Sequence, residues 1–221
     1  MDIKKDNVKA IVFDMDGVLF DTERIYFEAW YKVASEMDLD VSEVLTLCAG
    51  HNNADITVIF NEYYGGKVAY EEFGPRKNAA FRQIIAERGL PEKEGLHEIM
   101  EFLKKNGYRI ALATSTRREA AESHLRQAGI LQYFDVLTTG DMFVHGKPDP
   151  EIYSTACKLL GSDPARTYAV EDSYPGLESA HRAGLQPIMI PDQFPPTEYT
   201  NSIAITLPSL HALREWLAEK D

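Results

Sequence analysis

From Gly89 onward the sequence alternates between short apolar runs and longer segments with helical periodicity, and this alternation limits the possible folds more than any other feature. We expect strands at the apolar runs 109–113, 136–138, 167–170 and 187–190. Helices are expected at 96–105, 118–128, 150–160, 177–183 and 210–218. Strands separated by helices of this length form parallel βαβ units with helices on both faces of a sheet. The sequence therefore predicts an α/β fold with a Rossmann-like parallel sheet.

An earlier apolar run, at 8–13, is interpreted as a buried strand of the same sheet, because it is rich in β-branched residues and a polar turn follows it. Between this run and Gly89 apolar residues recur at helical spacing, and no strand pattern is evident. We therefore expect two domains, an α/β core of residues 1–20 and 90–221 and a helical-bundle cap of residues 21–89.

The composition limits the possible partners. The 221 residues include 23 Lys and Arg and 35 Asp and Glu, which gives a formal net charge of −12. Nucleic acid and anionic membranes bind proteins with a positively charged surface, so we expect neither as a partner. The N-terminal sequence fits neither a signal peptide nor a membrane span. Two distant cysteines, Cys48 and Cys157, fit ordinary thiols, and we expect a cytoplasmic monomer or weak dimer.

Chemically reactive side chains follow several of the predicted strands at the point where each strand ends. They are Asp14 and Asp16, Thr114 and Ser115, Lys147 after a longer connection, and Glu171 and Asp172. In an open parallel sheet, ligands bind beyond the carboxyl ends of the strands. The sequence therefore predicts that two acidic pairs, a hydroxyl pair and a lysine meet at one edge of the sheet.

The acidic pairs have an alternative interpretation. Asp16-Gly17 between apolar residues is typical of a β-hairpin turn, and Glu171-Asp172 is typical of a helix cap or a solvated loop. A hairpin does not account for Asp14, which follows a buried strand directly. Two close carboxylates repel each other unless a cation or a shared proton compensates. Together the pairs offer the hard oxygen ligands that Mg²⁺ takes, so magnesium is the expected cofactor.

Lys147 and the hydroxyl pair also have two interpretations. A single lysine is most often a solvated surface charge, but Lys147 lies in a segment that two prolines make stiff. A lysine held in this way near the site can neutralise a transferring phosphoryl group. Thr114 and Ser115 fit the cap of the following helix, and the same geometry points hydroxyl and amide groups at an anion.

Taken in order, these segments resemble all four motifs of the haloacid dehalogenase superfamily. The matching stretches are Asp14-Met15-Asp16-Gly17, Leu112-Ala113-Thr114-Ser115-Thr116, Gly146-Lys147-Pro148-Asp149-Pro150 and Glu171-Asp172-Ser173. The stretch 14–30 is similar to the β-phosphoglucomutase-like subgroup, in which a helical cap is inserted directly after the first motif. The resemblance spans residues 8–216, and four motifs in order make it specific.

The resemblance implies a phosphoryl-transfer mechanism. Asp14 is expected to attack phosphorus and form an aspartyl-phosphate, and Asp16 to act as general acid and base, with Thr114 and Lys147 completing the catalytic set. The implied metal ligands are oxygens of Asp14, Asp16, Glu171 and Asp172, with Glu171 acting directly or through water. The groups expected to hold the phosphoryl end of the substrate are Thr114, Ser115, Thr116, Arg117 and Lys147.

Substrate choice is expected to lie in the cap, because phosphatases and phosphomutases of this subgroup share the core residues. The sugar phosphomutases have a cap His and a cap Arg where this chain has Tyr26 and Asn53. An arginine is the natural partner for the second phosphate of a bisphosphate intermediate, so its absence favours hydrolysis. Further candidate substrate contacts are Glu23, His51 and Lys77.

The sequence therefore predicts a Mg²⁺-dependent phosphatase that acts on a small phosphomonoester, with a phosphorylated sugar or polyol as the expected substrate. A phosphomutase of the β-phosphoglucomutase type is the alternative, since Arg76, Lys77 and Arg117 supply positive charge. A third interpretation is a non-catalytic sugar-phosphate-binding protein. Asp14 and Asp16 argue against it, because binding alone needs neither a nucleophile nor an acid.

Overall fold

The computed structural model of the protein describes residues 9–48 and 53–220 of the chain. Its centre is a sheet whose described strands all pair in parallel, in the order β3-β2-β1-β4-β5-β6. The strands are β1 (Ala10–Phe13), β2 (Arg109–Thr114), β3 (Val136–Thr139), β4 (Thr167–Glu171), β5 (Gln186–Met189) and β6 (Ile205–Thr206). The predicted α/β fold with a parallel sheet is confirmed.

The strand order determines where a ligand crevice forms. β1 lies in the middle of the sheet, with β2 on one side and β4 on the other. The chain builds one half from β1 to β3 and then returns to build the other half from β4 to β6, so the order reverses beside β1. In doubly wound sheets, the crevice for ligands lies outside the carboxyl ends of the strands at this reversal. The ligand site is therefore expected beyond the carboxyl ends of β1 and β4.

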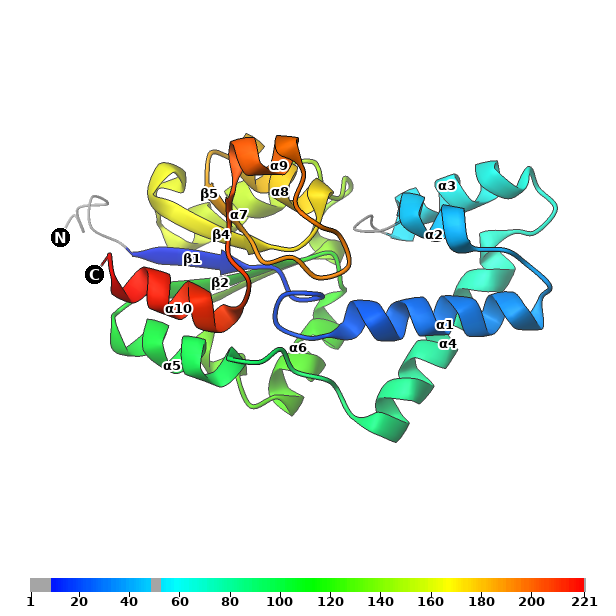
Figure 1. The fold of residues 1–221 in the computed structure, drawn as a ribbon, viewed down its shortest axis with the longest axis horizontal. Helices are drawn as coiled ribbons and strands as arrows, with labels where there is room; N and C mark the ends of the chain where they lie inside the picture. Colours follow the sequence, from blue (N-terminus) through cyan, green and yellow to red (C-terminus); the bar gives the residue numbers. More distant parts are fainter. Residues whose placement is uncertain (1–8, 49–52, 221) are drawn as a thin grey trace.

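Helices cover both faces of the sheet (Figure 1). Side chains alternate along β1, so Ile11 and Phe13 face one helical layer while Val12 faces the other. The layer on the Ile11 face contains α5 (Leu96–Lys105), α6 (Arg118–Gln127) and α10 (Leu210–Ala218). The opposite layer contains α7 (Glu151–Leu160) and α8 (Tyr174–Arg182). The shorter helices are η2 (Leu131–Tyr133), η3 (Gly140–Met142), η4 (Pro164–Arg166) and α9 (Glu198–Ile203).

A group of helices between β1 and α5, called the helical part below, lies beyond the carboxyl edge of the sheet (Figure 1). It consists of α1 (Thr22–Glu36), α2 (Ser42–Cys48), α3 (Asn53–Tyr64) and α4 (Tyr70–Arg88). Its hydrophobic cluster is separate from those of the sheet and centres on Trp30, whose ring centroid lies 4.8 Å from that of Phe73 and 5.9 Å from that of Phe60. This cluster holds the four described helices together as one unit.

Two chain segments join the helical part to the sheet, and they run side by side. Phe20 of the outgoing segment and Glu92 of the returning segment form an antiparallel bridge. The backbone N–H of Lys93 donates to the carbonyl oxygen of Leu19 at 2.9 Å. The ammonium of Lys93 lies 2.6 Å from Asp192 Oδ1, in the loop that follows β5. The two crossings are thus tied to each other and to the core.

The observed elements differ from the predicted ones at a few positions. α9 and β6 were not predicted, because a helix of six residues and a strand of two are too short to show a periodic apolar pattern. α8 begins at Tyr174 rather than at residue 177, since the Ser173 hydroxyl accepts a hydrogen bond from the N–H of Gly176 at 3.2 Å and Pro175 fits the first helical turn. The first strand is seen from Ala10, and residue 8 lies outside the described range.

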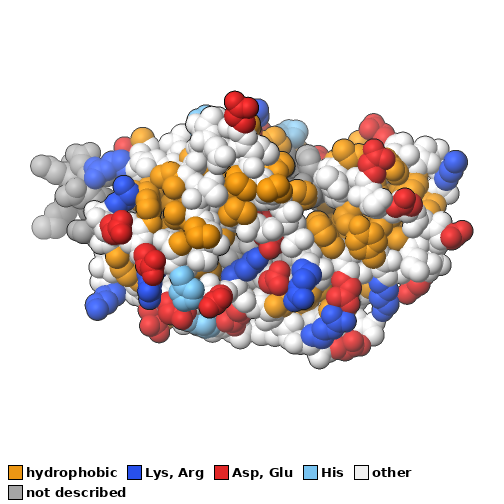
Figure 2. Space-filling view, viewed as in Figure 1, with side chains coloured by type: hydrophobic (Ala, Val, Ile, Leu, Met, Phe, Trp, Pro, Cys, Tyr) orange, Lys and Arg blue, Asp and Glu red, His pale blue; other side chains and the backbone are white. Residues whose placement is uncertain are grey.

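The outer surface of the described chain gives two further observations. None of its helices has both the length and the apolar content that a membrane crossing requires. Acidic and basic side chains are interspersed along the lower edge of the face in Figure 2, over the region where α1 and α4 run in Figure 1. No single sign of charge dominates this edge.

Candidate active site

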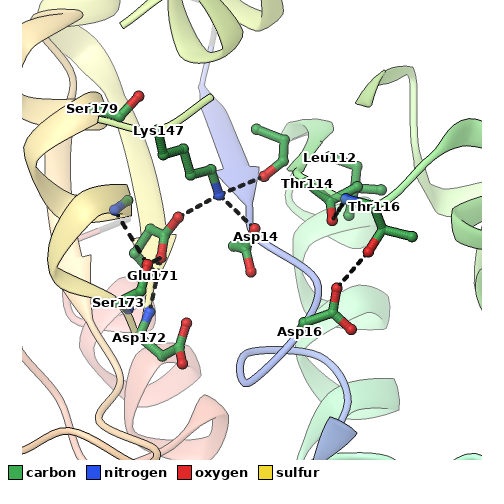
Figure 3. A network of polar contacts seen from close by, with 12 residues as sticks. Asp14, Asp16, Leu112, Thr114, Thr116, Lys147, Glu171, Asp172, Ser173 and Ser179 are labelled. Carbon is green, nitrogen blue, oxygen red and sulfur yellow. Dashed lines mark hydrogen bonds and ion pairs between the residues drawn. The ribbon is translucent and has the colours of Figure 1, made fainter. Parts of the chain in front are cut away.

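The predicted acidic and hydroxyl residues meet at the carboxyl edge of the sheet (Figure 3). Asp14 follows β1 directly, and its backbone N–H donates to the carbonyl oxygen of Val170 in β4 at 2.9 Å. Thr114 is the last residue of β2, and Glu171 is the last residue of β4. Because these parallel strands end at the same edge, residues far apart in the sequence lie within contact of one another.

Lys147 is the centre of a buried polar network. Its ammonium donates to Asp14 Oδ1 at 2.5 Å, to Glu171 Oε1 at 2.6 Å and to the carbonyl oxygen of Ala113 at 3.0 Å (Figure 3). The side chain is only 3% exposed. Three acceptors match the three donors of an ammonium group, so the charge is fully hydrogen-bonded where it is buried. The surface interpretation of Lys147 is therefore excluded.

Glu171 lies behind Lys147 and is fully buried. Its Oε1 accepts hydrogen bonds from Lys147 and, at 2.7 Å, from the hydroxyl of Tyr153. Its Oε2 accepts from the backbone N–H of Asp172 at 3.1 Å and from the hydroxyl of Ser173 at 3.0 Å. Both oxygens thus have protein partners. This carboxylate orients the lysine on one side and the turn that carries Asp172 on the other.

Asp172 has a different environment, which fits a cation. The side chain is 5% exposed, and its carboxylate accepts no hydrogen bond from the residues that the structure describes. Oxygen atoms of Asp14, Glu171 and Asp172 lie within 4.8 Å of one another. Three carboxylates against one ammonium leave an excess of negative charge in a buried space. Hard oxygen donors in this arrangement fit a divalent metal ion such as Mg²⁺.

The ionisation of the cluster reflects this excess. Burial raises the pKa of Asp14 to about 8, although Lys147 opposes the shift. Burial also raises the pKa of Asp172 well above its usual range, and the charge of Glu171 adds to the effect. Burial alone would lower the pKa of Lys147, but the two neighbouring carboxylates hold it above the ordinary value. A bound divalent cation would favour the ionised form of both aspartates.

Asp16 lies at the turn after β1, and a threonine holds each of its carboxylate oxygens. The hydroxyl of Thr22 donates to Oδ1 at 2.6 Å, and the hydroxyl of Thr116 donates to Oδ2 at 2.8 Å. Thr22 belongs to α1 and Thr116 to the loop after β2, so Asp16 is fixed from the helical part and from the sheet. The side chain is half-buried and faces the cavity described below.

The turn predicted after Asp16 is present and leads into a short flap. Gly17 has a φ of +81°, its N–H donates to the carbonyl oxygen of Phe20 at 2.8 Å, and a bridge joins Asp16 to Phe20. A Cβ atom at position 17 would lie 2.3 Å from Asp172 Oδ2. Glycine is required because both the backbone conformation and the close carboxylate leave no room for a side chain.

Gly17→Ala is expected to lower the free energy of unfolding by at least about 2 kcal/mol, because the new methyl group must displace Asp172 in addition to straining the backbone. Gly66→Ala is the matched control, since Gly66 has a φ of +78° but nothing within 4 Å of a Cβ. The expected loss in this control is about 1 kcal/mol. Urea unfolding measures both values, and equal losses would show that the contact with Asp172 does not constrain position 17.

A cavity of about 920 Å³ lies between the carboxyl edge of the sheet and the helical part. Most of the predicted site residues line it: Asp14, Asp16, Glu23, Tyr26, Asn53, Lys77, Thr114, Ser115, Thr116, Arg117, Lys147 and Asp172. Glu171 lies behind this lining, and His51 lies outside the described residues. The fold thus brings the candidates from both parts of the chain around one space.

The wall contributed by the helical part carries a buried cation and an acid. Lys77 is 2% exposed, its ammonium lies 4.2 Å from the centroid of the Tyr26 ring, and it pairs with no carboxylate of the described residues. Burial lowers the pKa of Lys77 to about 8. Burial, reinforced by the charge of Asp16, raises the pKa of Glu23 to about 8. The aromatic face stabilises the ammonium while leaving its donors available to a ligand.

Thr22, Tyr153 and His124 are among the site residues that were not predicted from the sequence. Thr22 holds Asp16, Tyr153 holds Glu171, and His124 lines the cavity from α6. The only sequence signal was for Thr22, which lies close to the first motif at the start of a helix. Tyr153 and His124 fall in ordinary helical patterns, where nothing distinguishes a site residue from one that packs elsewhere.

The comparisons with known proteins agree with this geometry. The sequence profile of a hydrolase family, haloacid dehalogenase-like hydrolase, matches residues 8–184. A phosphorylated carbohydrates phosphatase of Thermotoga maritima is 37% identical over 182 residues, which cover 82% of this chain and 84% of the relative. Beta-phosphoglucomutase of Bacillus subtilis is 31% identical over 189 residues, with 80% and 81% covered.

A solved structure shows the same similarity in three dimensions. The crystal structure of CbbY from Rhodobacter sphaeroides in complex with phosphate matches with a TM-score of 0.77 at 28% identity, covering 94% of this chain and 96% of that one. The family profile alone spans more than half of the sequence. The chain therefore belongs to the haloacid dehalogenase-like hydrolases, as its four motifs predicted, and is an enzyme of that family.

Proposed function

We propose that the enzyme is a Mg²⁺-dependent phosphatase that hydrolyses small phosphomonoesters, with phosphorylated sugars or polyols as substrates. The observation that carries this proposal is the pair Asp14 and Asp16 at one end of the cavity, with Lys147 2.5 Å from Asp14 and a threonine on each oxygen of Asp16. A nucleophile and a separate general acid are what hydrolysis through a covalent intermediate needs. The T. maritima relative, a phosphatase of phosphorylated carbohydrates, supports the substrate class.

The two aspartates would act in two steps. In the first, an oxygen of Asp14 attacks phosphorus, the bond from phosphorus to the leaving oxygen breaks, and Asp16 gives that oxygen its proton. In the second, water attacks the aspartyl-phosphate, Asp16 takes a proton from the water, and Asp14 is regenerated as phosphate leaves. General acid–base catalysis of this kind contributes roughly 10²–10⁴-fold. The hydrogen bonds from Thr22 and Thr116 would orient Asp16 for both steps.

The acidic cluster would hold the metal ion. The ligands would be the carboxylates of Asp14 and Asp172 and the backbone carbonyl of Asp16, with Glu171 orienting the Asp172 turn from behind. Bound there, Mg²⁺ would offset negative charge on the phosphoryl oxygens. Lys147 would neutralise Asp14, so that an anionic nucleophile and an anionic phosphoryl group can approach each other.

The loop that begins at the end of β2 would hold the phosphoryl oxygens. Thr114 and Ser115 border the cavity, and the backbone N–H of Thr116 donates to the Thr114 hydroxyl at 3.1 Å. That hydrogen bond leaves the hydroxyl proton of Thr114 to be donated to an anionic oxygen. Arg117 is exposed at the rim, where its charge would attract an anionic substrate.

Residues 21–89 would act as a cap domain over a core of residues 1–20 and 90–221. Closing the cap would exclude water from the reacting groups and bring its own side chains to the leaving group. The candidate contacts to sugar hydroxyls on this side of the cavity are Glu23, Tyr26, Asn53 and Lys77. The core would then supply the chemistry and the cap the choice of substrate.

Phosphomutase activity is the second candidate, because a beta-phosphoglucomutase is 31% identical over 80% of the chain. That reaction needs a bisphosphate intermediate whose second phosphate is bound away from the nucleophile. Asn53 borders the cavity, and its side-chain oxygen accepts a hydrogen bond from the hydroxyl of Tyr70 at 3.1 Å. A neutral amide stabilises a second phosphate less than a bidentate arginine does, which favours hydrolysis.

With Mg²⁺, the enzyme is expected to release inorganic phosphate from members of a panel of sugar and polyol phosphates, and EDTA is expected to stop the release. Readdition of Mg²⁺ should restore it. β-Glucose 1-phosphate separates the two candidates, because its conversion to the 6-phosphate without phosphate release would replace the hydrolase proposal with a phosphomutase. Phosphate release that continues at full rate in EDTA would contradict the metal dependence.

A further inference from the structure

The cavity extends beyond the groups that surround the phosphoryl site. Away from Asp14 it continues between the C-terminal half of α4 and the inner face of α6, and we call this region the distal chamber. Its walls are formed by Phe81, Arg82 and Ile85 of α4 and by Ser123, His124 and Gln127 of α6. Both triplets have the spacing i, i+1, i+4, which puts each of them on one face of its helix.

The distal chamber makes the cavity longer and larger than one sugar phosphate needs. The residues from Arg117, at the rim of the phosphoryl site, to Gln127 rise about 15 Å along the axis of α6. A pyranose ring, built from bonds of about 1.5 Å, spans about a third of that length. The whole cavity, at about 920 Å³, lies near the upper end of the roughly 300–1,000 Å³ that small-molecule sites enclose. One sugar phosphate would therefore occupy only the part next to Asp14.

The two walls of the distal chamber differ in chemistry. Phe81 and Ile85 offer an aromatic ring and an aliphatic chain, and the Phe81 ring is held edge-on to Tyr26 at 6.4 Å. The α6 wall offers a hydroxyl, an imidazole and an amide, while Arg82 pairs with no carboxylate of the described residues. A sugar ring has C–H groups that suit an aromatic face and a rim of hydroxyls that suit polar side chains. The two walls of the distal chamber therefore offer partners for both the C–H groups and the hydroxyls of a sugar ring.

His124 has hydrogen-bonding capacity that the protein does not use. Its ring lies edge-on to Phe20 at 6.1 Å, and its Nδ1 is buried with no hydrogen-bond partner among the described residues. A buried polar atom without a partner costs free energy. His124 lines the cavity, so a ligand hydroxyl that reaches this ring would satisfy the unpaired nitrogen.

We infer that the distal chamber is a second sugar-binding subsite, so that the substrates are phosphorylated disaccharides or comparable glycosides. The phosphorylated ring would occupy the part of the cavity lined by Glu23, Tyr26 and Lys77, and the second ring would lie between α4 and α6. This inference rests on the proposed phosphatase activity, which puts the phosphoryl group at Asp14.

Steady-state phosphate release from trehalose 6-phosphate, sucrose 6-phosphate and glucose 6-phosphate tests the inference. The wild-type enzyme is expected to have a kcat/KM at least about tenfold higher for one of the two disaccharide phosphates than for glucose 6-phosphate. Gln127→Trp fills the far end of the distal chamber. It is expected to lower kcat/KM for the preferred disaccharide phosphate about tenfold or more, and to change that for glucose 6-phosphate less than about twofold.

Arg126→Trp is the matched control, because Arg126 lies on the same helix, pairs with Glu122 at 3.4 Å and does not line the cavity. It is expected to leave all three values unchanged. An equal loss on all substrates in Gln127→Trp would show that the chamber is a common entrance, and a wild-type preference for glucose 6-phosphate would likewise overturn the subsite. Release of phosphate from other members of the sugar and polyol phosphate panel but from neither disaccharide phosphate would overturn the subsite alone. Failure of the phosphatase proposal looks different, since the wild type would then release phosphate from no member of the panel.

Discussion

Asp14→Asn is expected to lower kcat for phosphate release by about 10⁴-fold or more and to leave the fold intact. Asparagine keeps the shape of the side chain, but its amide cannot form the covalent bond that the proposal assigns to the carboxylate. Without metal, a carboxyl group whose pKa is raised to about 8 is mostly neutral at neutral pH, so asparagine replaces one neutral group by another in this buried acidic cluster. Without metal, the free energy of unfolding is therefore expected to equal or exceed that of the wild type.

Phosphate release with Mg²⁺ and urea unfolding in EDTA measure these two effects separately. Asp38→Asn is the matched control, because Asp38 is exposed and has a φ of 54°, a conformation that asparagine also adopts. Full activity and full stability are expected in this control. Turnover close to the wild-type rate in Asp14→Asn would remove Asp14 from the mechanism.

Lys147→Met is expected to have the largest effect on stability. The ammonium is 3% exposed and lies 2.5 Å from an oxygen of Asp14 and 2.6 Å from an oxygen of Glu171. Removing one partner of a buried ion pair leaves uncompensated charge, which costs about 3–5 kcal/mol. Methionine fills a similar volume, so the loss comes from charge rather than from a cavity. Activity should fall as well, because nothing would then neutralise the nucleophile.

The stability lost in Lys147→Met relative to the wild type should grow as the pH rises above about 8, the pKa of Asp14 in the wild type. Burial raises the pKa of Asp14 to about 8 even against the attraction of Lys147, and without that attraction the pKa is expected to rise further. A carboxyl group with a raised folded pKa contributes its full stability below its unfolded pKa of about 3.9. The contribution is lost as the pH rises towards the folded pKa, which is about 8 in the wild type and higher in the variant. Above about pH 8 only the variant therefore continues to lose stability.

Urea unfolding of the wild type and Lys147→Met at about pH 7 and about pH 9.5, on either side of the wild-type pKa of Asp14, measures this dependence. Lys158→Met, at an exposed site on α7, is the control and is expected to behave as the wild type at both values. A stability difference between Lys147→Met and the wild type that stayed constant over this range would contradict the electrostatic account of the cluster.

The sheet and the meeting of its strand-end residues could be predicted because both follow from local patterns. A short apolar run followed by a helical period identifies each strand, and parallel strands bring their carboxyl ends to one edge. Asp14, Thr114 and Asp172 therefore converge whatever the details of packing. The same rule explains why the motifs, each weak alone, predicted the family once they were taken in order.

Contacts that depend on packing between distant segments could not be predicted. The hydroxyl of Tyr153 on Glu171, and that of Thr22 on Asp16, arise only when particular helices dock at particular angles. The position of Glu171 behind Lys147 is of the same kind, since the sequence cannot tell which acid of a neighbouring pair faces the cavity. The contacts of His51 stay a prediction, because that residue lies outside the described chain.

The paired crossings at Phe20 and Glu92 bear on how such a protein changes its preferences over time. The chain leaves the sheet and returns to it at almost the same point, and Lys93 ties that point to Asp192. Whatever lies between the crossings can lengthen, shorten or be exchanged without altering the register of any strand. During evolution, mutations between the crossings can thus change which molecules the enzyme recognises, while the residues that cleave the phosphate ester are inherited unchanged.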